Sequence, residues 1–364
     1  VQTLENLEMK KTLVAIAALA SVSAFAQSSV TLYGQFDAGI YNIKKANGTD
    51  SATVYGDGAI FSNILGFKGT EDIGGGLKAG FDFQTDVQTN NGGMNNSGLF
   101  RRQANVSLDG GFGNVKLGIT TNPLIATNGL LMPVAGNSVS TATSSALGYA
   151  DFYTKNAVTY TSPNLGGLTA QLQYGFSNNI ESAKDGSVVA GSLAYVNGPL
   201  AIRYAMQDRK EAAQNTANSS PNASSSTAGA FAKQSQVLGA RYEMGALSFG
   251  LAYLENKAAT AVGGAKTKID GYQAGVGYTT GAWLLGSTYT KSEGSSLTNL
   301  QARYALSKRT SLITQAGFAD NKATVKFSPI AFNTGSSPAT ITDTYAATAN
   351  TKQSGVGIAL AHSF

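Results

Sequence analysis

The end of the chain, residues 352–364, alternates in polarity with a period of two. Val356, Ile358 and Leu360 share one side of an extended segment, and small residues occupy the other. This is the spacing of a β-strand, in which successive side chains point to opposite faces. Residues 31–41, near the other end, repeat the pattern. Two amphipathic strands at opposite ends predict a sheet closed on itself, because an open edge in hydrocarbon would leave N–H and C=O groups unpaired.

The composition favours a membrane barrel over a soluble domain. Of the 364 residues, 13% are charged and 42% hydrophobic, and this charged share is about half of what soluble domains usually have. A barrel with an apolar outside and a weakly charged inside fits that balance. The chain has no Cys, which excludes disulfides and Cys-based zinc sites. The formal charge of +5 is spread along the chain, without the Lys/Arg clusters typical of nucleic-acid binding.

Amphipathic segments of about ten residues recur through the chain and predict about sixteen antiparallel strands. Short turns, as at 69–76 and 162–167, alternate with longer polar connections, as at 44–59, 122–155 and 321–351. We expect the short turns on the periplasmic side and the long loops outside. About sixteen strands enclose a water-filled lumen, whereas side chains would fill a barrel of about eight. Aromatic residues near the short turns fit an interfacial girdle: Tyr160, Tyr195, Tyr242, Trp283 and Phe364.

The N-terminal residues have the features of a secretory signal peptide. A basic start at Met9 is followed by an apolar run at 13–20 and an A-x-A site at 24–26. The run is too short to span a bilayer as a helix. We therefore expect residues 1–8 to be an upstream extension, 9–26 a signal peptide cleaved after Ala26, and 27–364 a single barrel domain.

Several stretches resemble the general porins of Gram-negative bacteria, in particular their betaproteobacterial and neisserial branch. The matching stretches are 28–34, 65–78, 102–104, 160–163 and the terminal Phe364. The resemblance implies a sixteen-stranded outer-membrane barrel, a homotrimer, and a third outer loop, 122–155, folded into the lumen as a constriction. It implies that Phe364 belongs to the signal read by the barrel-assembly machinery. The expected surroundings are outer-membrane lipid and lipopolysaccharide, with ions and small hydrophilic solutes passing through.

The sequence departs from this branch of the porin family at two places that bear on ion selectivity. Its strongly anion-selective members look as though they line the constriction with arginines from strands two, four and six. Ile64 and Thr159 stand at the first and last of these positions, which leaves Arg101 and Arg102. Strand parity favours Arg101 for the lumen, the family motif favours Arg102, and a β-bulge could reconcile the two. The third loop carries no charge before Asp151, so no strong transverse field is expected.

The predicted function is passive diffusion through a water-filled channel with a mild anion preference. Charged residues that parity or the resemblance places at the pore are Lys68, Asp82, Arg101, Arg102, Lys116, Asp151, Lys155, Arg203 and Arg303. Parity alone adds Asp37, Lys78, Asp86 and Arg241. The excess is basic, and like-signed charges in confined water concentrate the opposite ion. For any single residue, a solvated wall position neutralised by a neighbour is an equally good interpretation.

Three other functions compete with this prediction. Aromatic residues such as Tyr33, Tyr41 and Tyr55 could guide sugars or aromatic acids through a substrate-specific channel. A structural or adhesive barrel would conduct poorly. An outer-membrane enzyme would need partners for His362, the sole histidine, and the sequence offers none. The glycine spacing at 275–281 has no following helix and is not a nucleotide motif. No metal or cofactor is predicted.

Overall fold

A computed structural model describes most of the chain. The predicted extension 1–8, the signal peptide 9–26 and Asp151 lie outside the described residues. Within the described part, no helix combines the length and the apolar character needed to cross a membrane. The described residues are 29–94, 98–134, 136, 152–177, 183–210, 233–259, 264–322, 324–332 and 348–364.

The described chain is almost entirely β-structure. It has one short helix in the third long connection, α2 (Pro123–Asn128). The strands are β1 (Ser29–Lys44), β2 (Ala52–Asp57), β3 (Ile64–Gly74), β4 (Leu77–Asp86), β5 (Gln103–Gly110), β6 (Gly113–Thr121), β7 (Tyr153–Thr161), β8 (Leu168–Gly175), β9 (Val188–Asn197), β10 (Leu200–Arg209), β11 (Lys233–Met244), β12 (Leu247–Ala259), β13 (Lys266–Thr280), β14 (Trp283–Ser292), β15 (Ser295–Ala305), β16 (Thr310–Asp320) and β17 (Lys352–Ser363).

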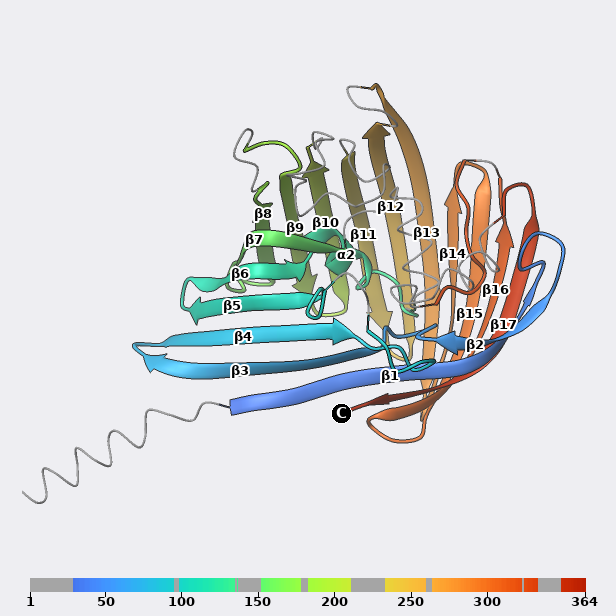
Figure 1. The fold of residues 1–364 in the computed structure, drawn as a ribbon, viewed down its shortest axis with the longest axis horizontal. Helices are drawn as coiled ribbons and strands as arrows, with labels where there is room; N and C mark the ends of the chain where they lie inside the picture. Colours follow the sequence, from blue (N-terminus) through green and yellow to red (C-terminus); the bar gives the residue numbers. More distant parts are fainter. Residues whose placement is uncertain are drawn as a thin grey trace, which may run out of the picture.

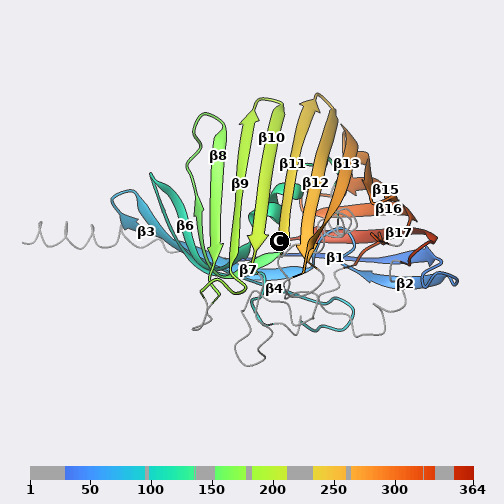
Figure 2. The same cartoon turned by 90° about the horizontal axis from the view of Figure 1, so that it is seen from above.

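The strands form one closed antiparallel barrel (Figures 1 and 2). From β3 onward each strand pairs with the next along the chain, and β17 pairs with β1, from Gln35 opposite Ser363 to Lys44 opposite Ser354. On its other side, β1 pairs with β3 through Ser29–Gln35 and with β2 through Ala38–Ile43. Because β2 and β3 share one place beside β1, the seventeen strands occupy sixteen positions. The predicted sixteen-stranded antiparallel barrel is confirmed.

The chain between β2 and β3 is held by the side chain of Asp37. One carboxylate oxygen of Asp37 accepts the backbone N–H groups of Ile60 and Phe61, at 2.6 and 2.8 Å. The Asn63 amide oxygen accepts the N–H of Asp37 at 2.5 Å. Asp37 is fully buried, so this predicted lumen charge instead satisfies backbone donors. The expected polar loop at 44–59 differs as well, since β2 lies within it and extends the pairing of β1.

Exposure alternates along the strands as the sequence pattern predicts. Leu32 and Ile40 of β1 are 61% and 60% exposed, whereas Asp37 and Tyr41 are buried. The same alternation in β17 exposes Val356. A barrel in a membrane turns its apolar positions to lipid, so the exposed apolar residues face the bilayer and the buried positions face the lumen.

The short turns gather at one end of the barrel, and the long connections at the other. One connection at the long-loop end departs from this rule, because β14 and β15 are joined by Glu293 and Gly294 alone. These two residues have φ of +48° and +79°. Two positive φ angles mark a tight hairpin turn that follows the twist of the strands.

Candidate pore constriction

The third long connection enters the lumen directly after β6. Asn122 caps α2 by accepting the N–H of Leu124 at 3.0 Å, and Pro123 suits the first helical position. The Asn122 amide also donates to Gln207 on β10 at 2.8 Å and to Thr154 on β7 at 3.2 Å. These bonds fix the direction in which the chain leaves the wall. The inward fold of the third loop is confirmed for residues 122–134 and 136.

Apolar side chains anchor this loop against the inner wall. Leu124 and Leu131 are fully buried and pack in one cluster with Ala205, Val237 and Leu254, from β10, β11 and β12. Figures 1 and 2 show α2 inside the barrel, beside β10 and β11. The loop is therefore held by hydrophobic burial, without charged contacts to its own side chains in the described range 122–134.

The third loop crosses the inner wall over a row of inward-facing glycines. We call it the glycine seat: Gly239, Gly250, Gly275, Gly277 and Gly286. Gly250 lies opposite Gly275, and Gly277 lies opposite Gly286, in neighbouring strands. A Cβ at Gly277 would lie 2.8 Å from Cβ of Pro133, and one at Gly275 2.9 Å from its Cδ. Such distances are sterically forbidden, so the loop can approach only where the wall has no side chains.

The sequence pattern alone does not reveal the glycine seat. In the sequence, the spacing of Gly275 and Gly277 is noticeable only as a chance match to a nucleotide-binding motif. A usable signal exists, because four consecutive strands, β11 to β14, each carry glycine at an inward position next to the loop. Recognising it requires the register between strands, and no single segment contains that information.

The last long connection also contributes to the narrowing. Val325 and Phe327 pack on Leu297 and Ala319 of the inner wall. Phe327 is fixed by Asn321, whose amide donates to the Phe327 carbonyl at 3.0 Å and accepts its N–H at 2.7 Å. Sequence reasoning predicts a long loop here but no inward segment.

A few residues further on, the same connection reaches β1 and β17. Ile330 belongs to a buried cluster with Tyr41 and Ala359, and Phe332 lies edge-on to Tyr41 at 5.4 Å. Residues 325–332 thus line the wall on the side that the third loop leaves free.

Arg101 and Arg102 both form ion pairs with the carboxylate of Asp86. Arg101 Nε lies 2.5 Å from one oxygen of Asp86, and Arg102 Nη1 lies 2.7 Å from the other. Arg102 also donates to Gln84 at 2.9 Å and lies 5.2 Å over the ring of Tyr153. The strand-parity argument fails for Arg101, because β5 begins only at Gln103. Two cations on one anion leave a local excess of one positive charge.

A second polar group continues along the same wall. Tyr33 donates its hydroxyl to Asp82 at 2.6 Å and accepts from the Gln84 amide at 3.1 Å. Lys68 lies opposite Asp82 in register, with its Nζ 5.1 Å over the Tyr33 ring. Since Gln84 also holds Arg102, these residues form one network with the arginine pair.

Three further arginines line other parts of the inner wall, on strands five or six positions from β5 around the barrel. Arg241 donates to the carbonyl of Met132 at 3.2 Å and to Glu243 at 2.6 Å. Arg303 donates to Ser311 at 3.0 Å and lies 5.1 Å over the ring of Phe61. Arg203 lies opposite Gly239 of the glycine seat. This group flanks the third loop, and Arg241 ties the loop to the wall through Met132.

Lys116 and Lys155 stand apart from these groups. Lys116 is half-buried in β6, in register with Ser107 and Thr159. Lys155 lies in β7 beside Asn156, whose φ is +48°. The register with β6 shifts at this point, so parity along β7 does not carry through Lys155.

The last residue of the chain, Phe364, pairs with β1 and so joins the two ends of the barrel wall. The N–H and carbonyl of Phe364 pair with Gly34 at 3.0 and 3.2 Å, and its ring stacks on Phe36 at 5.9 Å. His362 of β17 contacts Thr310 of β16 through Nδ1 at 2.9 Å. Among the described residues, no three His, Asp or Glu side chains are grouped closely enough to hold a metal ion.

The known proteins that this chain resembles are porins. The chain is 35% identical to outer membrane porin protein 32 of Delftia acidovorans over 226 residues, 56% of this chain and 61% of that protein. It is 30% identical to an outer membrane porin protein of Bordetella pertussis, over 67% of this chain and 69% of that protein. With the major outer membrane protein P.IB of Neisseria meningitidis serogroup B, the identity is 33% and the coverage 54% and 58%. The chain thus spans about three fifths of the length of the first of these relatives.

Solved structures agree at the level of the fold. The anion-selective porin from Comamonas acidovorans superposes with a TM-score of 0.69 at 24% identity, over 93% of this chain and 100% of that one. OmpT of Vibrio cholerae, in its trimer form, gives 0.66 at 15% identity, with the same coverage. The sequence profile of the Gram-negative porins matches residues 12–324. The chain therefore belongs to the Gram-negative porin family and is a β-barrel of the bacterial outer membrane.

Proposed function

We propose that the protein is a general diffusion porin that lets ions and small hydrophilic solutes cross the outer membrane passively. The observation that carries this proposal is the third loop, which lies on the inner wall along the glycine seat. A loop packed against the wall narrows the lumen without filling it. In a channel of this kind, the narrowing sets solute size, and the charges beside it set ion preference.

The charges at the narrowing support a mild preference for anions. Arg101 and Arg102 together carry one positive charge more than their shared partner Asp86 neutralises. Arg203 and Arg303 add positive charge to other parts of the inner wall. The described part of the loop, 122–134, is uncharged. Basic groups on both walls concentrate anions in the confined water. The neutral loop segment 122–134 adds no positive charge of its own, so the preference depends on the few arginines of the wall and is expected to be mild.

A substrate-specific channel guided by tyrosines receives less support. Tyr41 is 1% exposed, next to Phe332, and the Tyr33 hydroxyl is engaged by Asp82. Tyr55 is exposed, but its hydroxyl contacts Thr89 at 3.0 Å. The Tyr41 ring is covered, and Tyr55 lies opposite Ile40 on the outer face of the wall, so these residues do not form a guiding row in the lumen.

The partners of the channel are part of the same proposal. A homotrimer follows from the family, and recognition of Phe364 by the barrel-assembly machinery agrees with its place at the seam beside Gly34. Membership of a channel family supports a function without catalysis. The packing of His362 on Thr310 gives no reason to propose a catalytic group.

Two measurements on the purified protein test the proposal. In liposome swelling assays, we expect neutral sugars to enter at rates that fall steadily with size, without preference for one stereoisomer. In a salt gradient across a planar bilayer, the reversal potential should show chloride passing a few times more readily than potassium. Saturable uptake of one sugar would support the specific channel instead, and preference for potassium would contradict the assignment of the arginines.

A further inference from the structure

Residues 58–61, between β2 and β3, leave the barrel wall and enter the lumen; we call them the inward bend. Gly58 has a φ of +65°, in the left-handed region that suits glycine, and its N–H donates to the Asp37 carbonyl at 2.8 Å. The Asp37 carboxylate then accepts the N–H groups of Ile60 and Phe61. Three hydrogen bonds to one residue of β1 therefore fix the direction of the bend.

The side chains of the inward bend cover the wall beyond β1. Ile60 is 3% exposed and packs with Ile313 of β16 and Ala361 of β17. The guanidinium carbon of Arg303, on β15, lies 5.1 Å from the centre of the Phe61 ring. The bend thus reaches from β1 across β17 and β16 to β15, and burial of its apolar side chains stabilises it there.

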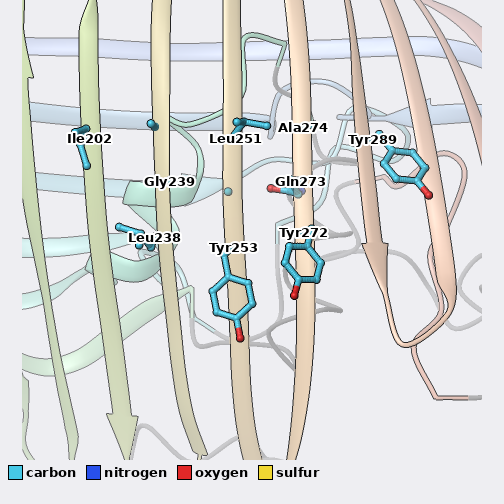
Figure 3. A pocket seen from close by; sticks show the side chains of 11 residues that line it. Ile202, Leu238, Gly239, Leu251, Tyr253, Tyr272, Gln273, Ala274 and Tyr289 are labelled. Atoms are coloured by element: carbon cyan, nitrogen blue, oxygen red, sulfur yellow. The ribbon is translucent and has the colours of Figure 1, made fainter.

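The third loop approaches the inward bend from the opposite direction. Leu131 lies against β11 and β12, Pro133 against β13, and Val134 against β14, each where the wall carries a glycine. Figure 3 shows these strands from outside the barrel, where Leu251 and Tyr272 are exposed. The loop therefore follows the inner face of the wall from strand to strand, toward β15.

Gly136 is the point at which the third loop meets the inward bend. A Cβ atom on Gly136 would lie 3.6 Å from the Cα of Ile60, 3.7 Å from its carbonyl oxygen and 3.6 Å from Nε2 of Gln301 on β15. These are ordinary van der Waals distances, so one methyl group would fit, whereas a larger side chain would not. Loop and bend together form one continuous layer on the inner wall from β10 to β1.

We propose that the inward bend is the docking site for the far end of the third loop, and that Ile60 is a positioning residue that sets the width of the constriction. The loop has no charged side chain at 122–134 or 136, so its far end is held by backbone and apolar contacts. Asp37 and Arg303 act on the loop through the bend, since one holds its backbone and the other covers Phe61. The inference rests on the proposed channel function and deepens it.

Paired cysteines test the contact itself. The chain has no Cys, so Ile60→Cys combined with Gly136→Cys introduces the only two thiols. The Cα atoms of these residues lie within the span of a disulfide. We expect oxidation, or a short bismaleimide, to link the two thiols in the folded barrel, detected by mass spectrometry of the digested protein.

Ile43→Cys combined with Gly136→Cys is the control pair. Ile43 is as buried as Ile60 but belongs to a different cluster, around Tyr41 of β1, so this pair should stay unlinked. An unlinked Ile60–Gly136 pair would place the end of the loop elsewhere and overturn the proposal.

Single-channel recording tests the effect on the pore. In Gly136→Leu, the new side chain meets Ile60 and Gln301, so the end of the loop must move toward the pore axis. We expect roughly twofold smaller conductance steps, because the narrowest point limits the ion flow, and a smaller effect in Gly136→Ala. Ile60→Ala removes the packing on Ile313, so we expect a noisier open-channel current, which Ile60→Val should restore.

Ile43→Ala separates positioning from general loosening of the barrel. It removes the same atoms from an equally buried site, and it should lower the thermal midpoint as Ile60→Ala does, without the added current noise. Equal noise in the two variants would overturn the role of the bend. The wild type is recorded first, because a silent wild type contradicts the channel proposal. Wild-type steps that neither Gly136→Leu nor Ile60→Ala alters would overturn only this inference.

Discussion

Two buried carboxylates, Asp86 and Asp37, determine the net charge and the backbone hydrogen bonding in their surroundings. Asp86 is buried and neutralises one of the two adjacent arginines. Asp37, also buried, accepts backbone N–H groups between β2 and β3. Strand parity predicts both as acids of the lumen. Strand parity correctly places both side chains on the inner face of the barrel. It cannot show which carboxylates have partners, because the partners come from other strands or from segments without regular secondary structure.

Replacing Asp86 with Asn tests the electrostatic role of the arginine pair. The change removes the negative partner of Arg101 and Arg102, so the local excess rises from one positive charge to two. We expect the reversal potential in a salt gradient to shift toward stronger anion preference. Asp72→Asn, at the exposed short-turn end of β3, is the control and should leave it unchanged. An unaltered potential in Asp86→Asn would place the arginines away from the conducting path.

Asp37→Ala tests the support of the break between β2 and β3. The N–H groups of Ile60 and Phe61 would lose their acceptor, and each unsatisfied buried donor costs about 1–3 kcal/mol. We expect a lower midpoint of thermal unfolding, read from the heat-modifiable mobility of the barrel on gels. Asp50→Ala, in an exposed turn, should change the midpoint little. A midpoint equal to the wild type would show that water replaces the carboxylate.

At the scale of elements, the inward loops depend on features of the wall that cross several strands. The third loop follows the glycine seat, and residues 325–332 cover the wall of β15–β17. Period-two alternation predicts most strands because each strand carries its own pattern. It misses β2, which lies in a polar stretch and is defined by pairing with β1. It also misses the glycine seat, since that feature exists only in the register between strands.

Gly277→Ala tests the glycine seat. The added methyl group would lie 2.8 Å from Pro133, so the loop must move away from the wall and toward the pore axis. We expect lower single-channel conductance and slower entry of larger sugars. Gly80→Ala is the matched control, because its Cβ would meet only the rotatable Ser107 hydroxyl within 3 Å. Equal conductance of Gly277→Ala and the wild type would contradict the proposed seating.

For the whole molecule, closure of the wall and the two inward segments together define the channel. Pairing of β17 with β1 joins the two ends of the sheet, as a bilayer requires. The alternating pattern predicts this closure from the two ends of the chain. The width of the lumen could not be predicted, because it depends on how far the long connections fold inward, and their sequences carry no regular pattern.

The central claim is that the barrel encloses a continuous aqueous path narrowed, but not blocked, by its loops. Single-channel recording of the purified protein in a planar bilayer tests this most directly. We predict discrete, reproducible conductance steps that rise nearly in proportion to salt concentration, as expected for ions moving through water. A correctly folded barrel that inserts and yet gives no steps at molar salt would contradict the account.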